Sequence, residues 1–183
     1  ASDVYKRQGK QDEPPNLCWH TVRGRQRLGL IIDPGAAKGL LGTDTFLEIC
    51  NSLLIPSGRT WDDILDQSPA KSSFTGIEGG TTKGLNHVKF EFPLPHLGKG
   101  TFSGDLIGGN AGRCPALVPN PKLIENRLGV LCGYYENGDG LLLMQNATPL
   151  MGFRILLTDS DHYLLPIDGS AELDADIKIG PLR

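Results

Sequence analysis

One carboxylate in this 183-residue sequence stands in surroundings that suit catalysis. Asp33 follows the apolar run Leu28–Ile32 and precedes Pro34, Gly35 and Ala36. The apolar run predicts a buried strand, and Asp-Pro-Gly predicts a tight turn at its end. The strand would fix the carboxylate, and glycine would let backbone N–H groups approach it. Two such carboxylates held close together share one proton and can act as acid and base on one water molecule.

The Asp33 turn alone is weak evidence for this chemistry, because Asp-Pro-Gly is common in ordinary turns. About 40 residues further along, Ser73–Thr82 has threonine and aromatic residues around a glycine-rich centre, which predicts a β-hairpin. Alternating apolar residues at Val88, Phe90 and Phe92 predict a strand after it.

In this order, the segments resemble the protease domains of retropepsins from Copia-type and related retrotransposon polyproteins. Thr75–Gly80 looks like the glycine-rich flap that closes over bound peptide in that family. Phe102–Gly109, Pro115–Leu123 and Leu128–Leu131 are similar to its late strands and helix. The stretch Tyr163–Pro166 looks like one that is common in dinoflagellate retroelements.

The resemblance implies an all-β, retropepsin-like barrel with one or two short helices and one half-site per chain. It further implies a homodimeric aspartic endopeptidase that cleaves a retroelement polyprotein, with Asp33 of each chain as the catalytic pair. Pro34, Gly35 and Ala36 would complete the active-site turn. The flap that binds the peptide substrate would consist of Gly76, Ile77, Glu78, Gly79 and Gly80.

A second half-site inside the chain would make a dimer unnecessary, and two segments come close to one. In Leu156–Asp161 the position that needs glycine holds Asp161, and in Ile167–Ser170 the glycine comes one position too early. These aspartates are better interpreted as loop or strand-end carboxylates. Asp105, inside a strand-like segment, is interpreted as a structural hydrogen-bond acceptor.

The chain departs from the family at Pro34. The family has Thr or Ser there, whose hydroxyl and backbone N–H link the two active-site turns across the dimer. Proline has neither group, although its fixed φ could make the turn rigid. Two interpretations therefore stay open: a working enzyme, or a catalytically inactive retropepsin-like domain that serves dimerisation or peptide binding. An unrelated small β-barrel is a third.

Composition narrows the class of protein. The 24 glycines and 13 prolines favour a turn-rich globular chain of short strands. A net charge of -3 argues against a nucleic-acid-binding domain. No apolar run is long enough to span a membrane, so we expect no membrane partner and an intracellular, cytoplasmic protein. The spacing of the four cysteines and four histidines suggests no metal, no cofactor and no disulfide framework.

Periodicity predicts the other elements. Helical spacing of Phe46, Ile49, Cys50 and Leu53 predicts a helix, capped by Thr43 or Thr45 and ended by Pro56–Gly58. A short surface helix within Arg59–Pro69 stays open. A second helix would begin at Pro119 and carry Leu123, Ile124 and Leu128. Further strands are expected at Phe102–Ile107, around Val130–Cys132, at Leu141–Met144 after a turn at Asn137–Gly140, at Phe153–Leu157 and at Tyr163–Ile167.

The sequence also predicts where the domain begins and ends. Asp3–Gln8 looks like a translated sequencing adaptor, and Pro14-Pro15 suggests a linker, so we expect residues 1–20 to lie outside the fold. The retropepsin-like domain would span residues 21–168, with a disordered tail at 169–183.

Overall fold

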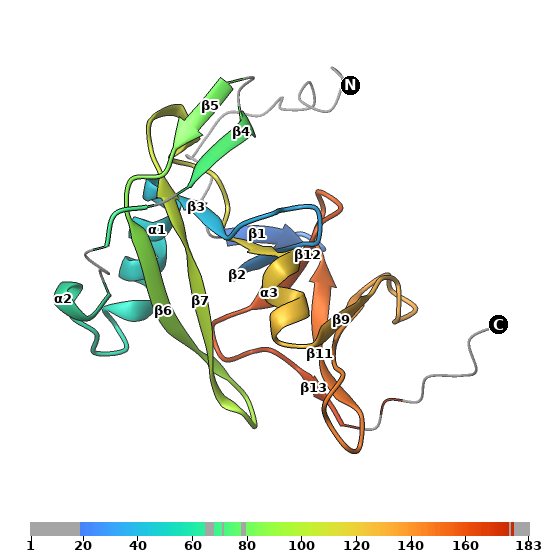
Figure 1. Cartoon of the computed structure of the whole chain (residues 1–183). Coiled ribbons are helices and arrows are strands. Elements are labelled where there is room, and N and C mark those ends of the chain that lie inside the picture. Colours follow the sequence, from blue (N-terminus) through green and yellow to red (C-terminus); the bar gives the residue numbers. More distant parts are fainter. Residues whose placement is uncertain (1–18, 65–67, 71, 78–79, 176, 178–183) are drawn as a thin grey trace.

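The computed structural model describes residues 19–64, 68–70, 72–77, 80–175 and 177 (Figure 1). Within them the chain is mainly β, as predicted, with a few short helices. The strands are β1 (Trp19–Val22), β2 (Arg25–Asp33), β3 (Leu40–Gly42), β4 (Ser73–Ile77), β5 (Gly80–Lys83), β6 (His87–Leu94), β7 (Gly98–Ile107), β8 (Leu117–Pro119), β9 (Leu128–Leu131), β10 (Gly140–Met144), β11 (Met151–Leu157), β12 (Tyr163–Pro166) and β13 (Leu173–Asp174). The helices are α1 (Thr43–Ile49) with its π-helical continuation η1 (Cys50–Leu54), α2 (Trp61–Ile64), the 3-10 turn η2 (Gly109–Ala111) and α3 (Asn120–Glu125).

Most of the strands belong to one large sheet. Its order is β6-β7-β3-β8-β2-β12-β11-β10-β9, with β1 also paired to β2 and β13 to β11. This order is an open path, so the hydrogen bonds between described strands do not close into a ring. The strands β4 and β5 form a separate hairpin, at the opposite end of the molecule from β13 (Figure 1).

Strand β2 is buried on both of its faces. Leu28, Leu30 and Ile32 point into the main hydrophobic core. Ile31, one position out of phase, packs in a second cluster with Leu164. Side chains alternate between the two faces of a strand, so a continuous apolar run is what such a doubly covered strand requires. The prediction of a buried strand that ends at Asp33 is confirmed.

Strand β8 lies between two strands that are neighbours in sequence. It runs parallel to β2, with Ile31 opposite Leu117 and Asp33 opposite Pro119. It runs antiparallel to β3. The chain therefore leaves β2, passes over the end of β8, and returns along β3. The backbone N–H of Asn120 donates to the carbonyl of Ala36 at 3.2 Å, which ties this crossing loop to the start of α3.

The first helix begins differently from the prediction. Its N-cap is Gly42, and neither Thr43 nor Thr45 caps it with a side chain. Instead the carbonyl of Gly112 accepts the N–H groups of Asp44 and Thr45, at 2.8 and 3.3 Å. A backbone carbonyl from a distant loop thus satisfies the donors that a side-chain cap would otherwise take.

Three other boundaries correct the sequence predictions. Trp19 and His20, expected in a linker, belong to β1 and pair with β2. Leu128, expected on a helix, begins β9, because α3 ends at Glu125. The tail expected to be disordered contains β13, which pairs with β11, and Ala171 is buried. Residues 1–18 and 178–183 lie outside the described residues. The predicted hairpin turn at Asn137–Gly140 is confirmed, because the strands before and after it, β9 and β10, pair antiparallel.

That turn contains a buried charge. Asp139 is fully buried, and its carboxylate accepts hydrogen bonds from both terminal nitrogens of Arg23, from Nε of Arg154, and from the backbone N–H of Leu157, at 2.8 to 3.2 Å. Burial alone would raise the pKa of this carboxyl, but the hydrogen bonds and the arginine charges hold the pKa below its ordinary value. Asp139 therefore joins the β1–β2 turn to β11.

We expect Asp139→Asn to lower the free energy of unfolding by about 3 kcal/mol at neutral pH, because it leaves two arginines without their carboxylate. A carboxyl with a depressed folded-state pKa stabilises the fold above its unfolded pKa of about 4, and that stability is lost as the pH falls through the folded pKa. Urea denaturation at pH 7 and at about pH 3 should show a difference between the two proteins that shrinks in acid. Asp161→Asn, at an exposed carboxylate, is the control. Equal stabilities at pH 7 would contradict this role.

Candidate active site

The Asp33 carboxylate is held by the turn that follows it. Its Oδ1 accepts a hydrogen bond from the backbone N–H of Gly35 at 2.9 Å. The backbone carbonyl of Asp33 accepts the N–H of Ala36 at 3.1 Å, which closes the turn. Pro34 is exposed at the tip, and Asp33 itself is half-buried. The sequence-based expectation of a glycine N–H against this carboxylate is therefore met.

The second oxygen of this carboxylate is the one that could act on a ligand. Oδ2 of Asp33 takes no hydrogen bond from the residues that the structure describes. It can therefore accept a proton, a water molecule or a second carboxyl group. The fixed strand and the bonded Oδ1 hold the carboxylate in one orientation.

A thiol lies near this carboxylate. Burial, together with the smaller effect of the negative charge of Asp33, raises the pKa of the half-buried Cys114 to about 11. The backbone carbonyl of Cys114 accepts the N–H of Gly42 at 2.9 Å, which ties the Cys114 backbone to β3. Such a thiol is protonated at neutral pH and is a poor nucleophile.

The β4–β5 hairpin joins the body of the protein near the Asp33 turn. Phe74 of β4 is buried in a cluster with Leu40, Ile107 and Ala111, against which Cys114 also packs. Lys38, just after the turn, donates through Nζ to Oγ of Ser72 at 3.0 Å. The N–H of Gly84 donates to the carbonyl of Ser72 at 2.9 Å and closes the base of the hairpin.

The predicted flap residues fall on this hairpin. Gly76 and Ile77 end β4, and Gly80 begins β5, with a bulge between Thr75 and Ile77. Glu78 and Gly79, at the predicted tip, lie outside the described residues. The hairpin is thus confirmed, and its contact with a substrate stays a prediction.

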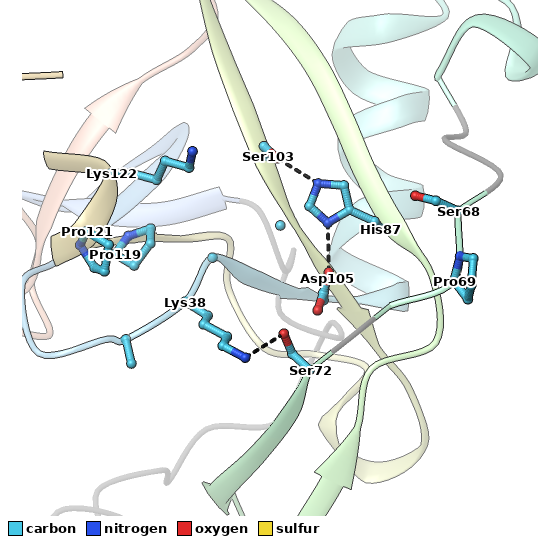
Figure 2. A pocket seen from close by; sticks show the side chains of 13 residues that line it. Lys38, Ser68, Pro69, Ser72, His87, Ser103, Asp105, Pro119, Pro121 and Lys122 are labelled. Carbon is cyan, nitrogen blue, oxygen red and sulfur yellow. Dashed lines mark hydrogen bonds and ion pairs between the residues drawn. The ribbon is translucent and has the colours of Figure 1, made fainter. Parts of the chain in front are cut away.

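A cavity of about 490 Å³ opens between the Asp33 loop, the base of the hairpin, and strands β6 and β7 (Figure 2). Lys38, His87, Ser103, Asp105 and Lys122 contribute to its lining. Asp105 accepts a hydrogen bond from His87 at 2.7 Å, in line with the structural role predicted for it.

His87 and Ser103 were not among the site residues expected from the sequence. Ser103 and Asp105 are two residues apart on one strand and must share a face, which the sequence could have indicated. Their contact with His87 depends on the register of the β6–β7 hairpin, where His87 pairs with Asp105. Residue spacing alone does not fix that register.

The two rejected half-sites have structural roles. The carboxylate of Asp159 accepts the N–H groups of Arg23 and Gly24, at 2.7 and 3.2 Å, in the β1–β2 turn. Asp168 accepts the N–H of Ser170 at 3.0 Å. Both are loop carboxylates that satisfy nearby donors, as the sequence suggested.

The described ranges do not support a metal site, a disulfide or a membrane-spanning helix. These residues contain no group of three His, Cys, Asp or Glu side chains arranged to hold a metal ion. Cys50, Cys114 and Cys132 are free thiols, and Cys18 lies outside the described residues. No described helix combines the length and apolarity that crossing a bilayer requires.

Comparison with protein families, curated proteins and solved structures gives no match for this chain. The candidate site therefore rests on its residues and their geometry.

The electrostatic effect of Asp33 on Cys114 can be tested without any enzymatic activity. Asp33→Asn removes the negative charge, so we expect the pKa of the Cys114 thiol to fall from about 11 while burial keeps it above its ordinary value. The pH dependence of iodoacetamide alkylation, followed by mass spectrometry of the Cys114 peptide, measures this change. The exposed Cys132 in the same molecule is the internal control and should not respond. An unchanged Cys114 profile would mean that the Asp33 charge does not act on the thiol.

Proposed function

We propose that the chain is one subunit of a homodimeric aspartic endopeptidase that uses Asp33 of both subunits to cleave a retroelement polyprotein. The supporting observation is the Asp33 carboxylate, held through Oδ1 by the Gly35 N–H at the end of a doubly buried strand, with no hydrogen bond to Oδ2 from the described residues. The polyprotein substrate rests on the sequence resemblance alone.

The proposed mechanism needs two such turns to face each other. One carboxylate, deprotonated, takes a proton from a water molecule, whose oxygen attacks the carbonyl carbon of the peptide bond. The other carboxyl gives its proton to the carbonyl oxygen, and a proton then passes to the leaving amine as the C–N bond breaks. Each chain has one suitable carboxylate among its described residues, so the reaction requires a dimer.

The hairpin β4–β5 has a defined part in this proposal. It joins the body beside the Asp33 loop through Phe74 and the Lys38–Ser72 hydrogen bond. A hairpin fixed at its base and rich in glycine further out can close over a bound peptide and exclude water. Its strands could also pair with the extended backbone of the peptide.

The proposal predicts that Asp33→Asn abolishes peptide cleavage, with a loss of at least about 10²-fold, because no carboxylate remains to move the proton. Cleavage of unstructured peptides by the wild type should be fastest in acid and blocked by pepstatin. Mass spectrometry of the products measures it. Asp168→Asn, at an exposed loop carboxylate that also accepts the backbone N–H of the residue two positions later, is the matched control and should keep full activity. Retention of full activity in Asp33→Asn would rule the proposal out.

One observation favours a second candidate, a catalytically silent domain for dimerisation or peptide binding. Pro34 is exposed at the turn and offers neither a hydroxyl nor an N–H to a partner turn. If the two turns cannot be linked, their carboxylates need not come within reach of one water molecule. Such a domain could still use its hairpin to hold a peptide.

Pro34→Thr separates the two candidates. Threonine would restore the hydroxyl and the N–H, so an active enzyme with a weak dimer should gain both dimer affinity and turnover. Sedimentation at several protein concentrations, run beside the cleavage assay, measures both quantities. Tighter dimers without any cleavage would favour the silent domain. No change in either quantity would show that the turns do not meet.

A further inference from the structure

The cavity beside the Asp33 loop contains a chain of three hydrogen-bonded side chains (Figure 2). Nδ1 of His87 lies 2.7 Å from Oδ1 of Asp105, and Nε2 of the same ring lies 2.7 Å from Oγ of Ser103. All three residues line the cavity. The proposed aspartic protease mechanism uses none of them.

The strand register brings these side chains together. Ser103 and Asp105 are two residues apart on β7 and share a face, and His87 of β6 lies directly opposite Asp105. The backbone is fixed from outside the hairpin as well. The N–H of Asp105 donates to Gly39 at 3.0 Å, and that of His87 donates to Ser68 at 3.1 Å. The three side chains are therefore positioned by the fold and not by a flexible loop.

The hydrogen bonds indicate which nitrogen and oxygen atoms carry the protons. An ionised carboxylate only accepts, so Nδ1 of His87 must carry the proton that Asp105 binds. In a neutral imidazole the remaining nitrogen, Nε2, is then an acceptor. The Ser103 hydroxyl consequently donates its proton to Nε2, which leaves the lone pairs of Oγ available to attack a carbonyl carbon.

The exposure of the side chains increases from Asp105 to His87, as such a chain needs. The Asp105 side chain is 8% exposed, and the His87 side chain is 34% exposed. Ser103, half-buried, lines the open cavity. A buried carboxylate keeps its hydrogen bond to the imidazole free from competing water, while the serine stays within reach of a ligand.

We propose that Ser103, His87 and Asp105 form a nucleophilic serine centre that hydrolyses small carboxylic esters independently of Asp33. Ser103 and His87 are its catalytic residues, and Asp105 is a positioning residue for the imidazole. The cavity, at about 490 Å³, matches the usual size of a small-molecule site.

The reaction needs no further reactant besides water. Oγ of Ser103 bonds to the ester carbonyl carbon as its proton moves to Nε2 of His87. The imidazolium then gives that proton to the alkoxy oxygen, the carbon–oxygen bond of the ester breaks, and the alcohol leaves. A water molecule passes a proton to Nε2, and its oxygen bonds to the acyl carbon. The bond between Oγ and the acyl carbon then breaks, the proton returns from Nε2 to Oγ, and the carboxylic acid leaves.

The cavity also supplies positive charge for the oxyanion of the intermediate. Lys38 and Lys122 both line it, with Lys38 bonded to the neutral Ser72 and Lys122 paired with Glu125. Ammonium groups at the wall of a partly closed cavity favour the negative charge that develops on a carbonyl oxygen.

A fluorophosphonate probe tests the proposal on the full chain, because it labels a serine only when that serine is activated. We expect one labelled site, Ser103, identified by peptide mass spectrometry. Ser103→Ala should lose the label, and His87→Gln should slow labelling at least about 10²-fold. Hydrolysis of p-nitrophenyl acetate should fall in parallel. Thermal unfolding of each variant shows that the fold is kept.

The chain offers a matched control in Ser160, whose Oγ lies 3.3 Å from Nδ1 of His162. No carboxylate bonds the other side of that imidazole among the described residues. Ser160 should stay unlabelled, and Ser160→Ala should leave the rate of Ser103 labelling unchanged.

The role of Asp105 has its own measurement. Asp105→Asn should lower the maximal labelling rate and leave the probe concentration for half-maximal rate unchanged, because the carboxylate acts only through His87. A change in both quantities would mean that Asp105 shapes the cavity itself and does not act only through His87. No labelling of folded wild-type protein, or equal labelling of Ser103 and Ser160, would overturn the whole proposal. Labelling without an effect of His87→Gln would overturn it too. None of these readouts depends on peptide cleavage by Asp33.

Discussion

The insertion of β8 between β2 and β3 is the constraint on which the candidate site depends. Because β8 runs parallel to β2, its end coincides with the end of β2, and Asp33 comes to lie opposite Pro119. The loop after Asp33 must then pass over β8, where the Asn120 N–H holds the Ala36 carbonyl. The orientation of one carboxylate thus follows from a pairing between segments more than 80 residues apart.

The buried charge cluster and the candidate chemistry lie in different parts of the molecule. The buried carboxylate of Asp139 gathers two arginines and a backbone N–H around the β1–β2 turn and β11. The polar groups of the candidate sites lie beyond the other end of β2, on the loop from Asp33 and on the β6–β7 hairpin.

The sequence predicted the parts of the fold that local patterns determine. The apolar run before Asp33, the alternation of Val88, Phe90 and Phe92, and the glycine turn at Asn137–Gly140 each correspond to observed elements. Contacts between distant segments were missed. The Gly112 carbonyl, from a distant loop, caps α1. The strand order β2-β8-β3 also cannot be predicted from the spacing of residues along the sequence. The partner of His87 likewise depends on a hairpin register that spacing does not fix.

The close crossing of Gly39 and Gly104 limits how this sequence can change. A Cβ on Gly39 would lie 2.5 Å from the Ser103 carbonyl oxygen, and one on Gly104 would lie 2.9 Å from the Gly39 carbonyl carbon. Neither position can accept a side chain unless the two backbones separate. During divergence, therefore, these two glycines should persist together, whatever happens to Asp33, His87 or Ser103. A distant descendant of this protein would be easier to recognise by that glycine pair than by any group that performs chemistry.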